Sequence, residues 1–321
     1  RFRISIDREA WTKRQAEVSN ELPVLAPCQW SGGGLASTRI ERGDDVHAVS
    51  LDALKRYEAA DRSKAEDIAS LLAQKTKLAK LPLPDDLDEL AGDGYIALIH
   101  ADGNGVGASR PRDEAAAAHF FHRNRWLMRL ATQTAIDAVC DGNEKVAPLV
   151  PLMLGGDDLL VVCRAEKALP FVAKLCRALA DAQQKNPNGF ELTLGVGVVI
   201  AKPNIPIHRL HEVAEQLASS AKRRFRGLEK AGEAPRSVVD WAVYTSTWVE
   251  EPGEVRRRDW LRSVENERLV LSQRPLDVLG PGLNTLEGLL EGAEVLENKR
   301  KEGKLARSQL RYLVEQLSRG R

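Results

Sequence analysis

Two acidic places in the sequence carry side chains that could hold a metal ion. Asp102 follows the apolar run at residues 95–101, and Asp157 and Asp158 end the run Leu-Gly-Gly-Asp-Asp at residues 154–158. Crowded carboxylates repel one another and raise one another's pKa values unless a cation neutralises them. Mg²⁺ and Mn²⁺ prefer oxygen ligands, and Mg²⁺ shares its coordination sphere with substrate phosphates. We therefore predict a Mg²⁺ or Mn²⁺ site, with Asp102, Asp157 and Asp158 as catalytic and metal-binding residues.

An acidic pair at a turn also has an ordinary explanation. A Gly-Asp-Asp turn is most often a solvated hairpin with no chemical role. Asp102, however, stands at the end of the preceding apolar strand. This position favours the metal site, because Asp102 and the Asp157 turn meet in the fold derived below.

Glycines next to the carboxylates leave room for a substrate. The run Asp-Gly-Asn-Gly-Val-Gly at residues 102–107 lets the backbone turn sharply and present N–H groups to a phosphate. The two glycines before Asp157 leave the hairpin bare, so that a base or a ribose can approach it. The run is not a dinucleotide-binding fingerprint, because the next helix begins too late. We expect the nucleotide to be bound by Gly103, Gly105, Gly107, Gly155 and Gly156.

The carboxylates meet only if strands and helices follow one another in a particular order. Apolar runs predict four strands and helical spacing predicts two helices, in the order strand, helix, strand, strand, helix, strand. This order is typical of the ferredoxin-like α+β fold, in which an antiparallel sheet carries both helices on one face. The first strand is then central and pairs with the third, which places Asp102 beside the Asp157 turn. The strands are expected at residues 95–101, 146–154, 159–163 and 190–201, the helices at 113–140 and 169–179, with a further helix at 210–225 and a strand near 237–244.

The pattern along the chain predicts four parts. The first, which begins at Arg1 rather than Met, is irregular, and we interpret it as the end of an upstream domain. A helix and a Pro-rich, acidic linker follow, then the domain that contains Gly-Gly-Asp-Asp, and then a helical domain with leucines at helical spacing. The boundaries are expected at residues 1–50, 51–91, 92–250 and 251–321.

Composition limits the classes of function. The 321 residues include 47 basic and 46 acidic side chains, a formal net charge of +1, so the balance does not indicate a protein that coats nucleic acid. Hydrophobic residues make up 43%, as in globular proteins. Apolar runs fall short of the roughly 20 residues that a membrane helix needs, so no membrane span is expected. Four scattered cysteines fit a reducing, cytoplasmic setting.

Together these motifs resemble one family, the large palm-domain subunit of type III CRISPR effector complexes, whose second palm makes cyclic oligoadenylates. The resemblance covers residues 27–226 and rests on Leu-Gly-Gly-Asp-Asp, on HADGNGVG at 100–107, on GVGVVIAKPNIPIHRL at 195–210 and on Ala-Lys at 221–222. Diguanylate cyclases share the palm more distantly. Leu159 stands where their signature has phenylalanine, which disfavours cyclic di-GMP.

The resemblance implies roles for individual residues. Asp102 and Asp157 would hold the metal ions with the Gly103 carbonyl nearby, and Asp158 would assist with the metal or the attacking hydroxyl. Lys222 would face the triphosphate, although a lysine late in a helix is often only a solvated charge. Asn104 and Ser109 would donate hydrogen bonds to a phosphate or a ribose. A ribose hydroxyl of one ATP would attack the α-phosphate of another and release pyrophosphate. The implied partners are ATP, a second palm from an upstream segment or a homodimer, and CRISPR effector subunits with guide RNA.

Some features depart from the family. Ser31 stands where relatives often have the second cysteine of a zinc half-site that begins at Cys28, so we expect no zinc there. His119 and His122 lie three residues apart, and we expect packing or surface roles for them. No His-Asp dipeptide occurs, so no nuclease domain is expected in this chain. Two alternatives to synthesis stay open, a silent palm that scaffolds a complex and a template-directed polymerase.

Overall fold

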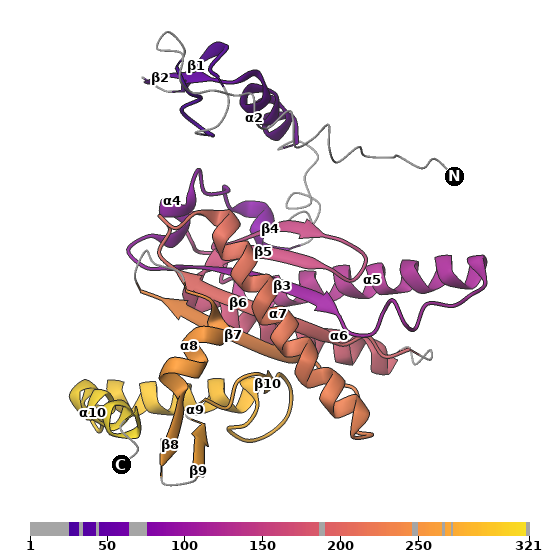
Figure 1. The fold of residues 1–321 in the computed structure, drawn as a ribbon, viewed down its shortest axis with the longest axis vertical. Helices are drawn as coiled ribbons and strands as arrows, with labels where there is room; N and C mark the ends of the chain where they lie inside the picture. The colour runs from indigo at the N-terminus through magenta and orange to yellow at the C-terminus, as the bar shows by residue number, and fades with distance from the viewer. Residues whose placement is uncertain are drawn as a thin grey trace. The chain divides into compact units, whose positions relative to one another are not determined.

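The structure is a computed structural model, and it divides the chain into two compact units, residues 1–67 and 68–321 (Figure 1). It describes residues 26–31, 35–42, 45–63, 76–185, 190–245, 250–264, 267–270 and 272–318. Among the helices so described, none is long and apolar enough to cross a membrane.

The first unit contains a small hairpin followed by a helix. Strands β1 (Thr38–Arg42) and β2 (Asp45–Val49) pair antiparallel, and α2 (Leu51–Ser63) follows. The side chains of Cys28 and Val49 are buried, and the Trp30 ring lies 5.2 Å from the ring of Tyr57. Residues 1–50 were predicted to be irregular, whereas their described part contains a two-stranded sheet.

The second unit is built on a six-stranded sheet in the order β10-β7-β6-β3-β5-β4. The central strand β3 pairs antiparallel with both β5 and β6, while β7 runs parallel to β6. The four predicted strands therefore have the ferredoxin-like order, and the predicted pairing of the first with the third is confirmed. The strands are β3 (Ile96–Gly103), β4 (Leu149–Leu154), β5 (Leu159–Arg164), β6 (Leu194–Ala201), β7 (Val238–Tyr244) and β10 (Leu276–Asp277).

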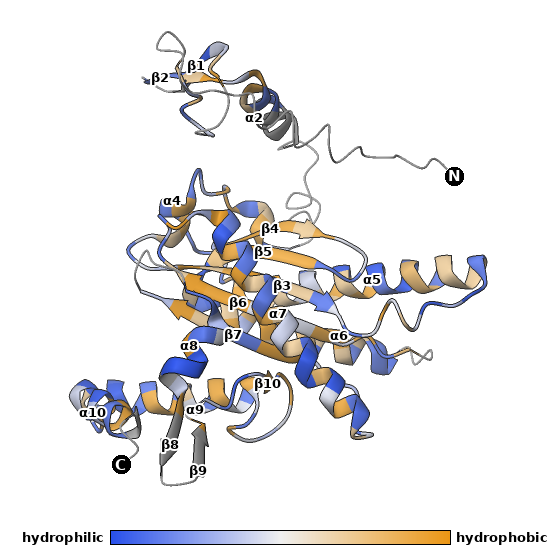
Figure 2. Ribbon diagram, in the orientation of Figure 1, coloured by the Kyte–Doolittle hydropathy of each residue, from blue (hydrophilic) through white to orange (hydrophobic). Residues whose placement is uncertain are grey.

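Helices cover both faces of this sheet. On one face, α5 (Glu114–Val139) and α6 (Ala165–Lys185) pack in one core with alternate residues of β3, namely Ala97, Ile99 and Ala101. On the other, α7 (Ile207–Lys230) packs with Ile96 and Leu98 (Figure 1). Figure 2 shows how strongly apolar the strands between these layers are. Since successive strand side chains alternate, Asp102 belongs to the α7 face.

A glycine on β6 lets α7 approach the sheet closely. A Cβ atom on Gly197 would lie 2.0 Å from the Ala214 carbonyl oxygen and 2.5 Å from the Ala218 nitrogen. Those neighbours are helix backbone, so no side chain fits at this position without moving α7 away. The alternation of glycine and valine in β6 is therefore a packing requirement.

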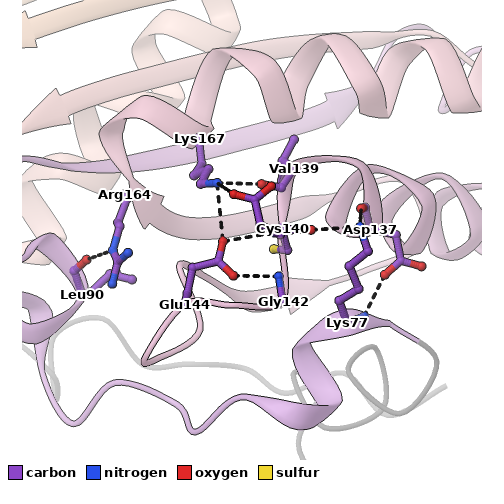
Figure 3. A network of polar contacts seen from close by, with 10 residues as sticks. Lys77, Leu90, Asp137, Val139, Cys140, Gly142, Glu144, Arg164 and Lys167 are labelled. Atoms are coloured by element: carbon purple, nitrogen blue, oxygen red, sulfur yellow. Dashed lines mark hydrogen bonds and ion pairs between the residues drawn. The ribbon is translucent and has the colours of Figure 1, made fainter.

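The residues before β3 pack on the same unit (Figure 3). They form a short 3₁₀ helix (Lys77–Lys80) and α4 (Leu87–Ala91). Lys77 Nζ donates to the Cys140 carbonyl at 3.1 Å, and Arg164 Nε donates to the Leu90 carbonyl at 2.9 Å. Residues 76–91, predicted as part of a linker, thus contact the palm directly.

The chain after residue 250 contains more than the helices predicted for 251–321. Besides α9 (Leu286–Lys301) and α10 (Arg307–Ser318), at the predicted leucine spacing, it has short strands β8 (Leu261–Val264) and β9 (Glu267–Val270). Strand β10 pairs with β7 and so joins the main sheet. The helix α8 (Pro252–Val255) and a π-helical turn (Arg256–Trp260) lead into these strands.

Candidate active site

The fold brings the three predicted carboxylates together. Asp102 stands near the end of β3, and Asp157 and Asp158 lie in the turn that joins β4 to β5. Ala101 pairs with Leu159, so the next step of the same register sets Asp102 opposite Asp158. The Gly155 N–H closes the turn by donating to the Asp158 carbonyl at 2.7 Å. Hairpin geometry and sheet register together therefore build the cluster.

The cluster has the geometry and the electrostatics of a cation site. One carboxylate oxygen from each of Asp102, Asp157 and Asp158 lies within 4.8 Å of the others. Partial burial raises the pKa of Asp157, and the charge of Asp102 adds to the effect. Burial and the contact with Asp102 raise the pKa of Asp158 to about 6. An oxygen-only donor set that resists losing its protons fits Mg²⁺ or Mn²⁺, which would neutralise it.

Lys222 joins the cluster from helix α7, which covers the face of the sheet that carries Asp102. Its Nζ forms an ion pair with Asp102 Oδ2, and its positive charge partly offsets the rise in the pKa values of Asp157 and Asp158. The lysine is therefore not a solvated charge on the far side of α7. The predicted contact with a triphosphate stays a prediction.

Two glycines allow the parts of the site to approach one another. A Cβ atom on Gly103 would lie 2.7 Å from Asp157 Oδ2, and one on Gly195 would lie 2.6 Å from Lys222 Cγ. Sequence reasoning assigned Gly103 to phosphate and metal binding and gave Gly195 no role. The structure adds that both positions exclude a side chain so that Asp157 and Lys222 can reach Asp102.

A cavity of about 460 Å³ adjoins the cluster and is shared by several predicted nucleotide-binding residues. Lys222 links the two, because it lines this cavity and also pairs with Asp102. Of the residues predicted to bind the nucleotide, Gly103, Gly107, Gly155 and Gly156 lie outside the lining. A larger cavity of about 610 Å³, around Trp241 and Arg274, is not lined by the three carboxylates. The smaller cavity is lined by Asn104, Gly105, Ala108, Ser109, Phe190, Glu191, Lys222, Phe225, Arg226, Glu229 and Pro235.

Asn104 anchors the glycine-rich loop. Its side chain is only 2% exposed, and its Nδ2 donates to Thr193 Oγ1 at 3.1 Å. Its backbone N–H also donates to the Thr193 carbonyl, at 2.8 Å. Its Oδ1 is buried without a hydrogen-bond partner, which leaves one acceptor at the cavity wall. Asn104 thus has a positioning role besides its predicted contact with a nucleotide.

The basic residues near Lys222 have separate environments. Arg226 lines the 460 Å³ cavity, whereas Arg224 Nε donates to Asp277 Oδ1 at 3.0 Å. Arg223, Arg224 and Arg226 are all exposed. Only Arg226 of these three therefore adds positive charge beside the predicted nucleotide site.

Sequence reasoning missed a second group on the same face of β3. His100, His211 and Glu215 also place one ligand atom each within 4.8 Å of one another. Burial, with a contribution from His211, lowers the pKa of His100. The signals in the sequence were the position of His100 two residues before Asp102 and the helical spacing of His211 and Glu215. His119 and His122 are exposed and belong to neither group, nor does Cys28.

The site lies within a segment that a protein-family model recognises. Residues 95–227 match the model described as Cas10/Cmr2, second palm domain. This part of the chain is a Cas10/Cmr2-type palm domain. The match includes β3, the Asp157 turn and Lys222, so all the predicted site residues belong to the palm.

Several solved structures are similar to part of the chain. A Csm1–Csm4 cassette in complex with cA4 is 17% identical, with a TM-score of 0.37, over 43% of this chain and 21% of that chain. Csm1 of T. onnurineus is 18% identical, with a TM-score of 0.37, over 43% of this chain and 22% of that chain. A Csm1–Csm4 subcomplex of a type III-A CRISPR-Csm interference complex is 17% identical, with a TM-score of 0.37, over 43% of this chain and 21% of that chain. The matched part therefore spans about a fifth of the length of these structures. No curated protein matches the chain significantly.

Proposed function

We propose that the palm domain is a metal-dependent nucleotidyltransferase that joins ATP molecules into cyclic oligoadenylates within a type III CRISPR effector complex. The observation that carries the proposal is the group Asp102, Asp157 and Asp158, linked through Lys222 to a cavity of nucleotide size. A scaffold without chemistry has no need to keep partly buried carboxylates together, because each raises the cost of ionising the others.

The metal would be held by the acidic cluster. Asp102 and Asp157 would be its ligands, with the Gly103 carbonyl nearby, and Asp158 would be a further ligand or lie next to the attacking hydroxyl. Bound Mg²⁺ or Mn²⁺ would supply neutralising charge to the phosphates and lower the pKa of a coordinated hydroxyl. In this proposal Lys222 exchanges its contact with Asp102 for one with a phosphate once the cation is bound.

The cavity beside the cluster would hold one ATP. Its volume of about 460 Å³ lies within the usual range for ligand pockets. Lys222 and Arg226 provide positive charge for the triphosphate, and Phe190 and Phe225 provide apolar walls for the base. Gly105 and Ser109 present backbone and hydroxyl groups between these two ends.

The reaction needs a second nucleotide, the acceptor. Its ribose hydroxyl oxygen would form a bond to the α-phosphorus of the held ATP, while the bond from that phosphorus to pyrophosphate breaks and the hydroxyl proton leaves. Reacting atoms must come within about 3.5 Å, and the cavity beside the acidic cluster is assigned to only one of the two nucleotides. We therefore include a second palm in the proposal, from an upstream segment or from a second copy of this chain.

Template-free incubation with ATP and Mg²⁺ tests the proposal, with products identified by mass spectrometry. We expect oligoadenylates from the folded protein, more of them at higher protein concentration or with a second palm supplied. Asp157→Asn with Asp158→Asn should abolish synthesis, and Asp102→Asn should do so too, because an amide keeps the shape and loses the charge. Asp181→Asn, an exposed position on α6, is the matched control and should keep wild-type activity.

Three outcomes would contradict the proposal. Synthesis retained by a folded Asp157→Asn, Asp158→Asn variant would remove the assignment of the site. Absence of product from a folded wild type that is supplied with a second palm would favour the scaffold alternative, and product formed only with a template would favour a polymerase.

A further inference from the structure

His100 lies where β3 meets α7. It is two residues before Asp102 on the strand, so both side chains belong to the face that α7 covers. Its ring centroid is 5.5 Å from that of His211, with the ring planes 31° apart. The two imidazoles therefore come from different layers of the palm, His100 from strand β3 and His211 from helix α7. Figure 1 shows α7 crossing the sheet.

A carboxylate completes this group from the same helix. Glu215 is one turn after His211 on α7, and His211 Nε2 lies 3.9 Å from Glu215 Oε1. The ligand atoms of His100, His211 and Glu215 all lie within 4.8 Å of one another. Two imidazoles and one carboxylate thus converge without belonging to the acidic cluster.

One ring nitrogen of this group lacks a partner. His100 Nδ1 is buried and makes no hydrogen bond among the described residues. A buried polar atom without a partner destabilises the fold, so such an atom in a native structure calls for an explanation such as a bound ion or water. A cation bound by the group would give the His100 imidazole the partner that the surrounding protein atoms do not.

From this geometry we propose that His100, His211 and Glu215 form a second metal site, which takes Zn²⁺ or a transition-metal ion of similar ligand preference. Two histidines and one glutamate are a known Zn²⁺ donor set that leaves a fourth position open for water or another ligand. Imidazole nitrogen favours such ions over Mg²⁺, which selects the oxygen-only cluster at Asp102. The two sites therefore differ in the metal that they select.

The donor atoms need only a small movement to bind the ion. Bonds of about 2 Å in a tetrahedral site place donor atoms about 3.3 Å apart. The side chains of His211 and Glu215 are 37% and 54% exposed, so their rotamers can adjust while His100 stays in place. Closing from at most 4.8 Å to this spacing is a change of at most about 1.5 Å in the distance between donor atoms, which rotation of these side chains can supply.

The bound ion would tie α7 to β3. Lys222 lies eleven residues after His211, close to three helical turns, and so projects from nearly the same side of α7. At the other end of the contact, Asp102 follows His100 on the strand. The metal would thus fix the alignment of the two elements that carry the Lys222–Asp102 ion pair, and it would stabilise the palm as any ligand specific for the folded state does.

Zinc titration of the full, tag-free and metal-free chain tests the proposal, with ZnCl₂ as the probe and calorimetry as the readout. We expect one equivalent to bind and to raise the melting temperature. His211→Ala and Glu215→Gln should each weaken binding about 100-fold or more, since even residues behind the ligands typically contribute 10- to 100-fold. His208→Ala and Glu212→Gln, exposed on the same helix, should bind Zn²⁺ as the wild type does.

Two further arms separate this site from its alternatives. Zn²⁺ binding should persist in the Asp157→Asn, Asp158→Asn variant, so a failure of the proposed ATP chemistry leaves this test intact. Co²⁺ bound in place of Zn²⁺ should give visible absorption without a thiolate charge-transfer band, which excludes the cysteines. The proposal is overturned if the folded wild type binds no Zn²⁺, or if binding survives His211→Ala or is lost in the Asp157→Asn, Asp158→Asn variant.

Discussion

Replacing Gly103 by alanine should damage the acidic cluster from inside the palm. The new Cβ atom would lie 2.6 Å from Val106 Cγ2, 2.7 Å from Asp157 Oδ2 and 2.8 Å from Asp157 Cβ. An ordinary contact starts near 3.4 Å, so Asp157 has to move by roughly 0.6 Å or more. Overpacking of this kind costs about 1 to 3 kcal/mol of unfolding free energy.

The same displacement should weaken metal binding. Metal–oxygen distances tolerate deviations of only about 0.2 Å, so a shift three times as large removes Asp157 as a good ligand. We expect at least a roughly tenfold loss of Mg²⁺ affinity, equivalent to about 1.4 kcal/mol. Urea unfolding in metal-free buffer measures the first effect, and calorimetric titration with Mg²⁺ measures the second.

Gly107→Ala is the matched control for this change. No atom lies within 4 Å of its added Cβ, and its φ is outside the left-handed region. Its stability should stay within about 0.5 kcal/mol of wild type, with unchanged Mg²⁺ affinity. Wild-type stability for Gly103→Ala would refute the packing argument. Reduced stability with unchanged affinity would show that Asp157 is not a metal ligand.

Three further predictions follow from the charges. The raised pKa of Asp158, about 6, means that protonation of Asp158 favours the folded state. In metal-free buffer, the unfolding free energy of Asp158→Asn should therefore rise relative to that of wild type as the pH increases from about 4 to 6. The Mg²⁺ affinity of the wild type should fall up to tenfold per pH unit below 6. Lys222→Ala should weaken ATP binding by about 1 to 3 kcal/mol, measured by titration with a non-hydrolysable analogue. Asp240 is fully buried and bound by two Arg256 nitrogens, so Arg256→Met should destabilise the fold by about 3 to 5 kcal/mol in urea, while adding Asp240→Asn should recover most of the loss.

Each of these has a contrary result. A pH-independent difference in unfolding free energy between wild type and Asp158→Asn would mean that folding does not raise the pKa of Asp158. Equal ATP affinity in Lys222→Ala and in the exposed control Lys230→Ala would remove Lys222 from the nucleotide site. Additive losses in the Asp240 and Arg256 double variant would show that the two side chains do not depend on each other.

The strand order could be predicted because each run carries its own signal. The apolar stretch before Asp102 alternates between two buried faces, and the break at residues 155–158 is short and rich in glycine. Register then follows from pairing, which is why the meeting of Asp102 with Asp157 and Asp158 was predictable before any coordinates. The family resemblance located Lys222, but its contact with Asp102 joins residues 120 positions apart and required the packing of α7.

Other features gave no readable signal. Gly197 is needed because the backbone of α7, a helix that starts ten residues later, packs against it, and no local pattern shows this contact. Strand β10 has only two residues, which are too few to show a periodic pattern. Residues 76–91 look like a linker in composition, yet Leu78 is buried in the main core. Such contacts depend on tertiary packing, which local patterns do not encode.

The glycine seam between β6 and α7 determines which half of the active site can move. With no side chain at Gly197 and little room at Gly195, strand and helix meet backbone to backbone and behave as a single rigid piece. The backbone of Lys222 is part of this rigid unit of β6 and α7, so it cannot move independently of the sheet. The carboxylates of the Asp157 turn sit instead on a short connection, and a Cβ atom on Gly156 would touch nothing. In the proposed reaction, adjustment of the site to a bound nucleotide would therefore come from this turn and from the side chain of Lys222, and not from the backbone of α7.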